Sequence, residues 1–371
     1  MISRSLANNK LINIMIMLRF IMTNRSPNDF IRGPSAWRGE ELAKTPENWL
    51  THILPNEICE LEQTAEKFIA ANNKISDISK ETFPLTIIRP RLEKLKQTLL
   101  KGCGFEVLRG LPVCDYSQEI AATIFCGIGA HLGNARSQNA MGHILGHVRD
   151  IGASAEDTNT RIYQTSERQT FHTDSADVVG LMCLRTAQEG GKSLLVSTET
   201  IYNEMRKLRP DLVELLFDPI ATDRRGEVPV GEKPYFEIPV LNWHNGKLTG
   251  KYQRQYIDSA QRFPSAFLLS DLHVEALNLF DQLANDPRLY LSMQLEVGDL
   301  QFVYNHSQLH DRTGFTDWPD PKDRRHLFRL WLSMEGDREL PECFKQRYGS
   351  IKVGDRGGII TEETELHIPL D

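Results

Sequence analysis

The chain has 371 residues, a formal net charge of −7 and 40% hydrophobic residues, which is enough apolar surface for a sizeable core. It has no Lys/Arg-rich run and no stretch of about eighteen apolar residues, so the sequence predicts neither nucleic-acid binding nor a membrane span. The cysteines are scattered and form no CxxC pair, which indicates reduced thiols in a cytosol-like compartment: Cys59, Cys103, Cys114, Cys126, Cys183 and Cys343.

Residues 1–28 form a basic N-terminal extension. This segment contains basic residues but no acidic residue, since Asp29 is the first acidic residue of the chain. Two interpretations stay open: an organelle presequence, or a start codon placed too early with Met22 as the true start. The second interpretation predicts a cytoplasmic protein, which we expect, and the first predicts a mitochondrial one.

Residues 29–95 are predicted to be a helical region that packs on the core. Within residues 55–75, apolar residues recur at helical spacing on one face: Ile58, Leu61, Ala65 and Phe68. A second, shorter helix is expected over residues 92–100, where glycines follow its last turn.

Residues 96–340 are richer in strands, with an inserted hairpin near 220–260, and residues 341–371 form a C-terminal tail. FEVLRGLPV predicts a strand that runs into a turn, Asn245-Gly246 marks the hairpin, and RRHLFRLWLSM predicts a long last strand. Further helices are predicted over residues 116–133, 198–217 (with a break at Pro210) and 276–289.

This order of elements predicts a mainly β fold with helical additions, of the α+β class. Strands bounded by Gly and Pro turns are typical of a β-sandwich or barrel. They do not alternate with helices as in a Rossmann sheet, and the chain has neither GxGxxG nor GxxxxGK[ST]. The sequence therefore does not predict a nucleotide-binding fold.

The stretch FHTDSAD places His172 and Asp174 two residues apart. In an extended segment, residues i and i+2 project from the same face, so both side chains can meet one ion. A third ligand is available downstream in VYNHSQLHDRTGF, which contains His306 and His310. Two imidazoles and one carboxylate form the facial triad that suits iron(II) and leaves open coordination positions.

The segments around these residues supply anion-binding groups. Gly190-Gly191 opens a predicted strand on which Ser193 faces inward. On the last strand, Arg325 and Arg329 share one face by strand alternation. Two inward arginines are costly to bury unless anions meet them, so a carboxylate co-substrate is expected beside the metal.

These motifs together resemble the TauD/TfdA family of iron(II)- and 2-oxoglutarate-dependent dioxygenases, which is related to taurine dioxygenase and gamma-butyrobetaine hydroxylase. The resemblance spans about residues 100–335 and rests on an ordered set: Tyr163–Thr165 leading to His172-Thr173-Asp174, Gly190-Gly191-x-Ser193, Gly298-Asp299, Asn305, Leu309-His310-x-Arg312 and Arg325-x-x-x-Arg329. It implies a double-stranded β-helix, or jelly-roll, core.

The resemblance also implies roles for single residues. His172, Asp174 and His310 match the iron ligands, with His306 packed near the site or at its rim. Ser193 and Arg325 match the residues that hold the distal carboxylate of 2-oxoglutarate, and Arg329 matches a residue that touches an anionic prime substrate. The interval from His310 to Arg325 is longer than in taurine dioxygenase, so which arginine holds 2-oxoglutarate stays open.

The implied activity is oxidation, foremost hydroxylation, of a C–H bond in a small anionic molecule, with iron(II), 2-oxoglutarate and oxygen as cofactor and co-substrates. Two alternatives stay open: a cupin-like metal enzyme that does not use 2-oxoglutarate, and a catalytically silent binding module. The sequence does not determine the substrate, the choice between hydroxylation, desaturation and cyclisation, or the oligomeric state.

The segment SQNAMGHILGHVRD is expected near the mouth of the substrate site, with Asn139 as a substrate contact. His143 and His147 in this segment have the i, i+4 spacing of a helix. No Glu or Cys partner accompanies them, so a second metal site is not predicted here.

Overall fold

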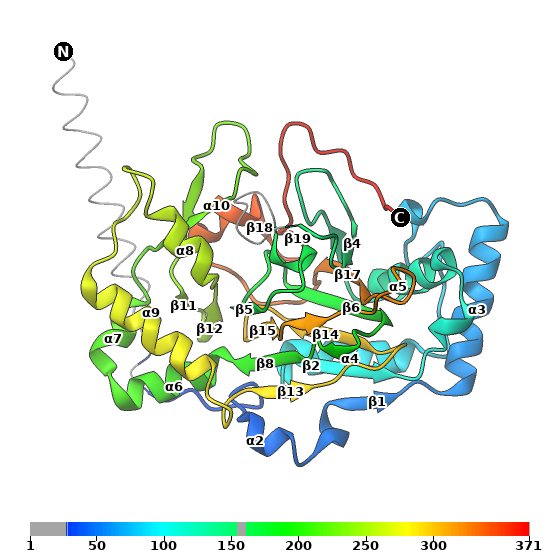
Figure 1. Ribbon diagram of the computed structural model, residues 1–371, viewed down its shortest axis with the longest axis horizontal. Helices are drawn as coiled ribbons and strands as arrows, with labels where there is room; N and C mark the ends of the chain where they lie inside the picture. Colours follow the sequence, from blue (N-terminus) through cyan, green and yellow to red (C-terminus); the bar gives the residue numbers. More distant parts are fainter. Residues whose placement is uncertain (1–26, 28, 154–160, 371) are drawn as a thin grey trace.

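Two β-sheets form the centre of the protein, and helices cover the outer face of each (Figure 1). The computed structural model describes residues 27, 29–153 and 161–370. The predicted N-terminal extension, residues 1–28, lies outside the described residues except for Pro27. No helix in the described part of the chain is long and apolar enough to cross a membrane.

The larger sheet is antiparallel apart from its first pair of strands, which is parallel. In spatial order its strands are β1 (Leu50–His52), β2 (Phe105–Arg109), β14 (Leu300–Tyr304), β6 (Val178–Arg185), β17 (His326–Ser333) and β3 (Asn134–Arg136), and β4 (Leu145–Val148) also pairs with β17. The helix-like spacing of His143 and His147 is misleading, because β4 pairing makes this segment extended.

The smaller sheet is fully antiparallel. Its spatial order is β13 (Leu291–Met293), β8 (Ser193–Ser197), β15 (Gln308–Arg312) and β5 (Gln169–His172). Leu195 and Met293 of this sheet pack with Val179, Val303 and Trp331 of the larger sheet in one buried cluster. Side-chain alternation along the strands therefore gives the two sheets a shared apolar interior.

Two groups of helices cover the outer faces. Against the larger sheet pack α3 (Pro55–Ala70), α4 (Arg89–Lys101) and α5 (Gln118–Leu132). Against the smaller sheet pack α6 (Thr198–Leu208), α7 (Pro210–Leu215) and α9 (Asp271–Ala284). The helical face predicted in α3 is confirmed: Leu61, Ala65 and Phe68 are buried, and Ile58 is half-buried against the same core. Pro210 begins α7, as its lack of an N–H group favours.

The other α-helices and strands among the described residues are short. They are α2 (Gly39–Leu42), α8 (Arg254–Ala260), α10 (Lys345–Tyr348), β7 (Glu189–Gly190), β9 (Ala221–Asp223), β10 (Tyr235–Glu237), β11 (Leu241–His244), β12 (Lys247–Gly250), β16 (Phe315–Thr316), β18 (Ile351–Lys352) and β19 (Asp355–Arg356). The predicted hairpin is confirmed: β11 and β12 pair around Asn245-Gly246, where both residues have the positive φ of a tight hairpin turn.

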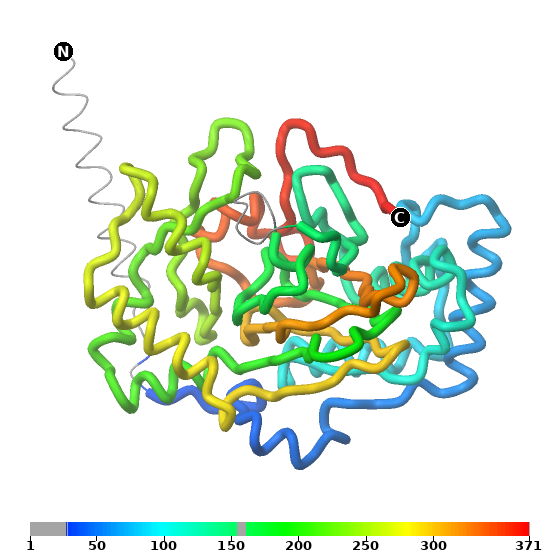
Figure 2. The backbone as a smooth tube through the Cα atoms, in the orientation of Figure 1, coloured from blue at the N-terminus to red at the C-terminus, as the bar shows by residue number. Residues whose placement is uncertain are grey.

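The C-terminal segment returns to the body of the molecule (Figure 2). Its α10 packs near β10, and Arg356 of β19 is 1% exposed. The segment ends along β4, where His367 forms a bridge with His143. Residues far past the predicted catalytic domain thus contribute buried side chains near the two sheets.

Candidate active site

His172, Asp174 and His310 meet where β5 pairs with β15. His310 is the register partner of His172, and Asp174 lies two residues beyond the end of β5. Asp174 Oδ1 is 3.9 Å from His172 Nε2, and Asp174 Oδ2 is 3.7 Å from His310 Nε2. Two donors that each bind one ion at about 2.1 Å lie at most about 4.2 Å apart, so these distances fit a shared ion. The donor set is that of an iron(II) facial triad.

The protonation of His172 also fits a metal ligand. Its Nδ1 donates to the carbonyl of Thr170 at 2.9 Å, because a carbonyl can only accept. Its Nε2 therefore carries the lone pair, which faces Asp174 and accepts from the amide of Gln169 at 3.0 Å. Burial and, to a smaller extent, nearby His310 lower the pKa of His172 to about 3. The imidazole is thus neutral at pH 7, as metal binding requires.

The larger sheet fixes the orientation of Asp174. Trp331 Nε1 donates to Asp174 Oδ2 at 2.7 Å, and Arg329 Nη1 lies 3.5 Å from the same oxygen. The backbone N–H of Asp174 donates to Asn305 Oδ1 at 3.0 Å. Burial raises the pKa of Asp174, but Arg329 and His310 outweigh this effect and hold the pKa well below its usual value. Asp174 is therefore ionised and ready to bind a cation.

Two cavities meet at these three residues. One, with an empty volume of about 570 Å³, is lined by His172, His310, Ser193 and Arg325. The other, with an empty volume of about 680 Å³, lies on the side of Asp174. Shared lining residues mark where the cavities join: Tyr163, Gln169, His172 and Arg329. We call the first the Arg325 cavity and the second the Asp174 cavity.

The Arg325 cavity has an incompletely paired cation. Arg325 is 6% exposed, its side chain lies over the ring of Phe315, and its Nη1 has no hydrogen-bond partner within the described residues. Burial lowers the pKa of Arg325 to about 10, which still leaves it charged at pH 7. On the same cavity wall, Ser193 Oγ donates to Gln301 Oε1 at 2.9 Å. A buried guanidinium with a free nitrogen fits a ligand carboxylate.

Arg312, from the motif Leu309-His310-x-Arg312, also lines this cavity. Its Nη1 donates to the carbonyl of Thr165 at 3.0 Å, its Nη2 donates to the carbonyl of Glu167, and its side chain stacks on Phe315. These contacts tie β15 to the segment that precedes β5. The positive charge of Arg312 adds to the attraction of the Arg325 cavity for an anion.

Arg329 and Asn139 have different surroundings. Arg329 lies between the rings of Tyr163 and Trp331 and donates through Nε to Gln138 Oε1 at 2.7 Å. Asn139, the neighbour of Gln138, lines neither cavity; its Oδ1 accepts from the backbone N–H of His143 at 3.2 Å. The contact of Asn139 with substrate stays a prediction.

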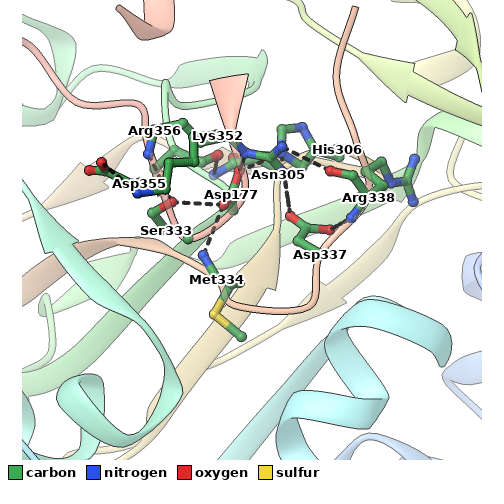
Figure 3. A network of polar contacts seen from close by, with 12 residues as sticks. Asp177, Asn305, His306, Ser333, Met334, Asp337, Arg338, Lys352, Asp355 and Arg356 are labelled. Atoms are coloured by element: carbon green, nitrogen blue, oxygen red, sulfur yellow. Dashed lines mark hydrogen bonds and ion pairs between the residues drawn. The ribbon is translucent and has the colours of Figure 1, made fainter. Parts of the chain in front are cut away.

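His306 does not lie on the same strand as His310. It lies in the turn between β14 and β15, where the chain passes from the larger to the smaller sheet. Its side chain is fully buried, and its Nε2 is 2.8 Å from Asp177 Oδ1 (Figure 3). The turn therefore separates the two histidines into different environments.

Asp177, His306 and Asp337 resemble a second metal cluster, but an arginine occupies its centre. Arg356 donates to Asp177 Oδ1 at 2.7 Å and to Asp337 Oδ2 at 2.8 Å (Figure 3). The guanidinium supplies the positive charge that a metal would bring. The network anchors Asn305, whose backbone N–H donates to the carbonyl of Asp177 at 2.9 Å, and so supports Asp174 indirectly.

The family model described as "Taurine catabolism dioxygenase TauD, TfdA family" matches residues 71–331. The chain belongs to this family. It is 30% identical over 328 residues to FR-33289 synthase of Streptomyces rubellomurinus, covering 87% of this chain and 96% of that protein. It is 32% identical over 305 residues to the taurine hydroxylase-like protein SAT17 of Stachybotrys chartarum, covering 80% and 77%.

Solved structures share the fold of this TauD/TfdA-family chain. Asparagine oxygenase in complex with Fe(II), 3-hydroxyasparagine and succinate superposes with a TM-score of 0.61 at 18% identity, covering 76% of this chain and 93% of the other. The non-heme iron oxygenase OrfP with Fe and alpha-ketoglutaric acid gives a TM-score of 0.59 at 15% identity, covering 76% and 93%.

Family membership makes the chain an iron(II)- and 2-oxoglutarate-dependent dioxygenase, which confirms the reaction class expected from the motifs. Family membership disfavours both alternatives, namely the cupin-like enzyme that does not use 2-oxoglutarate and the catalytically silent binding module. Among the solved structures with this fold, asparagine oxygenase holds 3-hydroxyasparagine and OrfP holds 3-hydroxyarginine, both of which are small molecules.

Several residues around the site were not predicted. Trp331 had a sequence signal, because alternation places it on the face of Arg329. Gln169 lies just before the His-x-Asp motif, but nothing in its type or position distinguishes it. Lys251 and Arg347, which line the Asp174 cavity, come from segments without any recognisable motif.

Proposed function

We propose that the protein hydroxylates a C–H bond of a small anionic substrate, with His172, Asp174 and His310 as the iron ligands. The observation that supports this most is the convergence of their donor atoms where two cavities join. The Arg325 cavity takes 2-oxoglutarate, and the Asp174 cavity takes the prime substrate.

In this proposal Arg325 and Ser193 hold the distal carboxylate of 2-oxoglutarate. The free Nη1 of Arg325 and the hydroxyl of Ser193 line the same cavity as His172 and His310. A buried arginine binds a carboxylate through a charge-assisted hydrogen bond, which fixes the orientation of the co-substrate. Arg312 adds positive charge at the same wall.

Iron(II), when bound with 2-oxoglutarate and oxygen, supplies the oxidation: 2-oxoglutarate becomes succinate and carbon dioxide, and one oxygen atom enters the substrate C–H bond. The protein residues supply geometry. Trp331 holds Asp174 in place, and Thr170 holds the His172 ring in the tautomer that leaves Nε2 free. Arg329 lines both cavities and is positioned to touch the prime substrate.

We further propose that the two sheets form a double-stranded β-helix, and that the chain is organised as the sequence predicted, with a catalytic domain over residues 96–340. The facing sheets and the TauD/TfdA-family match support this. Each sheet contributes one part of the site. The smaller sheet holds the two histidines, and β17 of the larger sheet holds Arg329 and Trp331, with Arg325 directly before its first residue.

The test is succinate release from 2-oxoglutarate with iron(II) and oxygen, measured over a panel of small anionic substrates. We expect turnover in the wild type and none in His310→Ala. The matched control is His367→Ala, since His367 is exposed and lines neither cavity. Equal turnover in His310→Ala and His367→Ala would contradict the ligand assignment.

A further inference from the structure

The Asp174 cavity has a strongly cationic wall. Its lining includes five positively charged side chains: Arg161, Arg224, Lys251, Arg329 and Arg347. Only two carboxylates line it, Asp174 and Asp223. Asp174 belongs to the metal triad, and Asp223 already pairs with Arg262 at 3.0 Å and accepts from Ser259 Oγ. Neither acid therefore neutralises the wall.

Some of these cations have counter-ions of their own. Arg161 pairs with Glu227, and Arg224 pairs with Glu232 at 3.3 Å. Arg329 lies beside Asp174. Lys251 and Arg347 remain, and neither has a carboxylate partner among the residues that the structure describes.

Lys251 and Arg347 converge on one hydroxyl group. Lys251 Nζ lies 3.2 Å from Ser175 Oγ, and Arg347 Nε donates to the same oxygen at 2.9 Å. The other partners of Lys251 are the backbone carbonyls of Thr173, at 3.3 Å, and Asp174, at 3.1 Å. Lys251 is 7% exposed. Two like charges that share one neutral partner in a buried site are costly unless an anion joins them.

Burial and the neighbouring Arg347 lower the pKa of Lys251 to about 7, so an anion bound beside Lys251 would stabilise its charged form. Burial lowers the pKa of Arg347 to about 9, and the neighbouring Arg161 and Arg224 add to the shift. The terminal nitrogens of Arg347 have no hydrogen-bond partner among the described residues, and the side chain lies against the ring of Phe236. Arg347 also lies beyond residue 331, where the family match ends. Lys251 lies within the matched region, so the pair combines one residue of the family region with one from the C-terminal segment.

We propose that Lys251 and Arg347 bind a phosphoryl dianion, a phosphonate or a phosphate monoester, at one end of the prime substrate. This inference rests on the proposed function and names the substrate class of the same site. A phosphoryl group carries about −1.5 to −2 charges at pH 7 and three acceptor oxygens, which match the free terminal N–H donors of Arg347 and the adjacent charge of Lys251. A carboxylate has one charge and two oxygens, so it would leave some of the positive charge of this cavity wall without a counter-ion.

The position of this pair also limits the substrate. Both cations contact Ser175, which directly follows the metal ligand Asp174. An anion between them lies next to the metal site, so the oxidised carbon is only a few bonds from phosphorus. The substrate is therefore oxidised near its charged end and not at a distant point of a long chain.

The experiment compares head groups on a common ethyl chain: ethylphosphonate, ethyl phosphate, ethanesulfonate and propionate. Each is titrated calorimetrically into the protein loaded anaerobically with iron(II) and 2-oxoglutarate, whose visible absorption reports cofactor binding. We expect both phosphoryl compounds to bind at least about tenfold more tightly than propionate, since one added charged hydrogen bond contributes about 1.5–3 kcal/mol. Succinate release then distinguishes the phosphonate from the phosphate ester as the oxidised class.

Variants connect this binding to the cationic pair. Arg347→Ala should weaken ethylphosphonate binding by roughly ten- to a hundredfold, while Arg347→Lys should retain part of the affinity. The affinity for 2-oxoglutarate should not change, because Arg347 does not line the Arg325 cavity. The matched control is Lys345→Ala on the same helix, whose exposed Nζ pairs with Glu342 at 2.8 Å. Thermal unfolding verifies that each variant is folded.

Propionate binding as tight as that of ethylphosphonate, or equal ethylphosphonate affinity in Arg347→Ala and Lys345→Ala, would overturn the inference. The titration is repeated on metal-free protein, because the cationic pair contains no metal ligand. Phosphonate binding that depends on Arg347 without formation of the iron(II)–2-oxoglutarate complex would support the phosphoryl site and contradict the proposed function.

Discussion

Trp331 Nε1 donates a 2.7 Å hydrogen bond to Asp174 Oδ2 and so connects β17 of the larger sheet to a metal ligand that follows β5 of the smaller sheet. The bond is buried and charge-assisted, and it fixes one carboxylate oxygen. The other oxygen, Oδ1, faces His172. The site thus depends on how the two sheets pack.

Replacing Trp331 with Phe should weaken iron(II) binding by roughly ten- to a hundredfold, because loss of a partner of a metal ligand has effects of this size. The aromatic ring remains, so most of the core packing is kept. The measurement is a metal titration of wild type and variant, with unfolding curves as control. Unchanged affinity would show that Asp174 is oriented without this bond.

The two histidines of the segment VYNHSQLHDRTGF should separate metal binding from stability. His310→Ala should abolish metal binding and leave the fold intact, since His310 is partly exposed at a cavity wall. His306→Ala should instead destabilise the protein by about 1–3 kcal/mol, because it removes a buried partner of Asp177. Metal titration and denaturant unfolding of both variants check this. Loss of metal binding in His306→Ala alone would reverse the assignment.

The two arginines of the last strand should have different effects on binding. Arg325→Ala should reduce 2-oxoglutarate affinity by about 2–5 kcal/mol, roughly thirty- to several-thousandfold, since it leaves the carboxylate poorly paired in a buried cavity. Arg329→Ala should mainly raise the apparent constant for the prime substrate. Titrations with each of the two compounds measure both effects. If Arg329→Ala mainly weakens 2-oxoglutarate, the two roles are exchanged.

Acidification should destabilise the protein through His326. Arg185 donates to its Nδ1 at 3.1 Å, and its Nε2 lies 2.9 Å from His147 Nδ1, while His147 Nε2 donates to the carbonyl of Pro369. Burial, His147 and Arg185 lower the pKa of His326 to about 3. The unfolded chain takes up a proton near pH 6.5, but the native state does not, so stability is full above pH 6.5 and falls as the pH drops toward 3.

The expected loss from His326 is about 1.4 kcal/mol at pH 5.5, and it grows by a similar amount for each further pH unit. Denaturant unfolding at several pH values measures it. His326→Gln retains a donor and an acceptor without titrating, so its stability should vary less with pH than that of the wild type. Identical pH profiles would exclude His326 as the titrating group.

Several features of the site were predicted from local sequence patterns. The pairing of His172 with Asp174 and the shared face of Arg325 and Arg329 follow from strand alternation, which depends only on neighbouring residues. The i, i+4 spacing of His143 and His147 failed for the opposite reason: pairing with β17, far away in the chain, imposes an extended backbone.

The sequence by itself determined the family, the reaction class and the predicted ligand set, because each motif is short and its geometry is local. Only the tertiary structure decided that His306 belongs to a buried ion-pair network and that Lys251 and Arg347 meet at Ser175. These residues come from separate segments without any shared spacing: the turn between β14 and β15, the residue that follows β12, and α10. Their convergence depends on how the sheets, the hairpin and the C-terminal segment pack, and no local pattern encodes that packing.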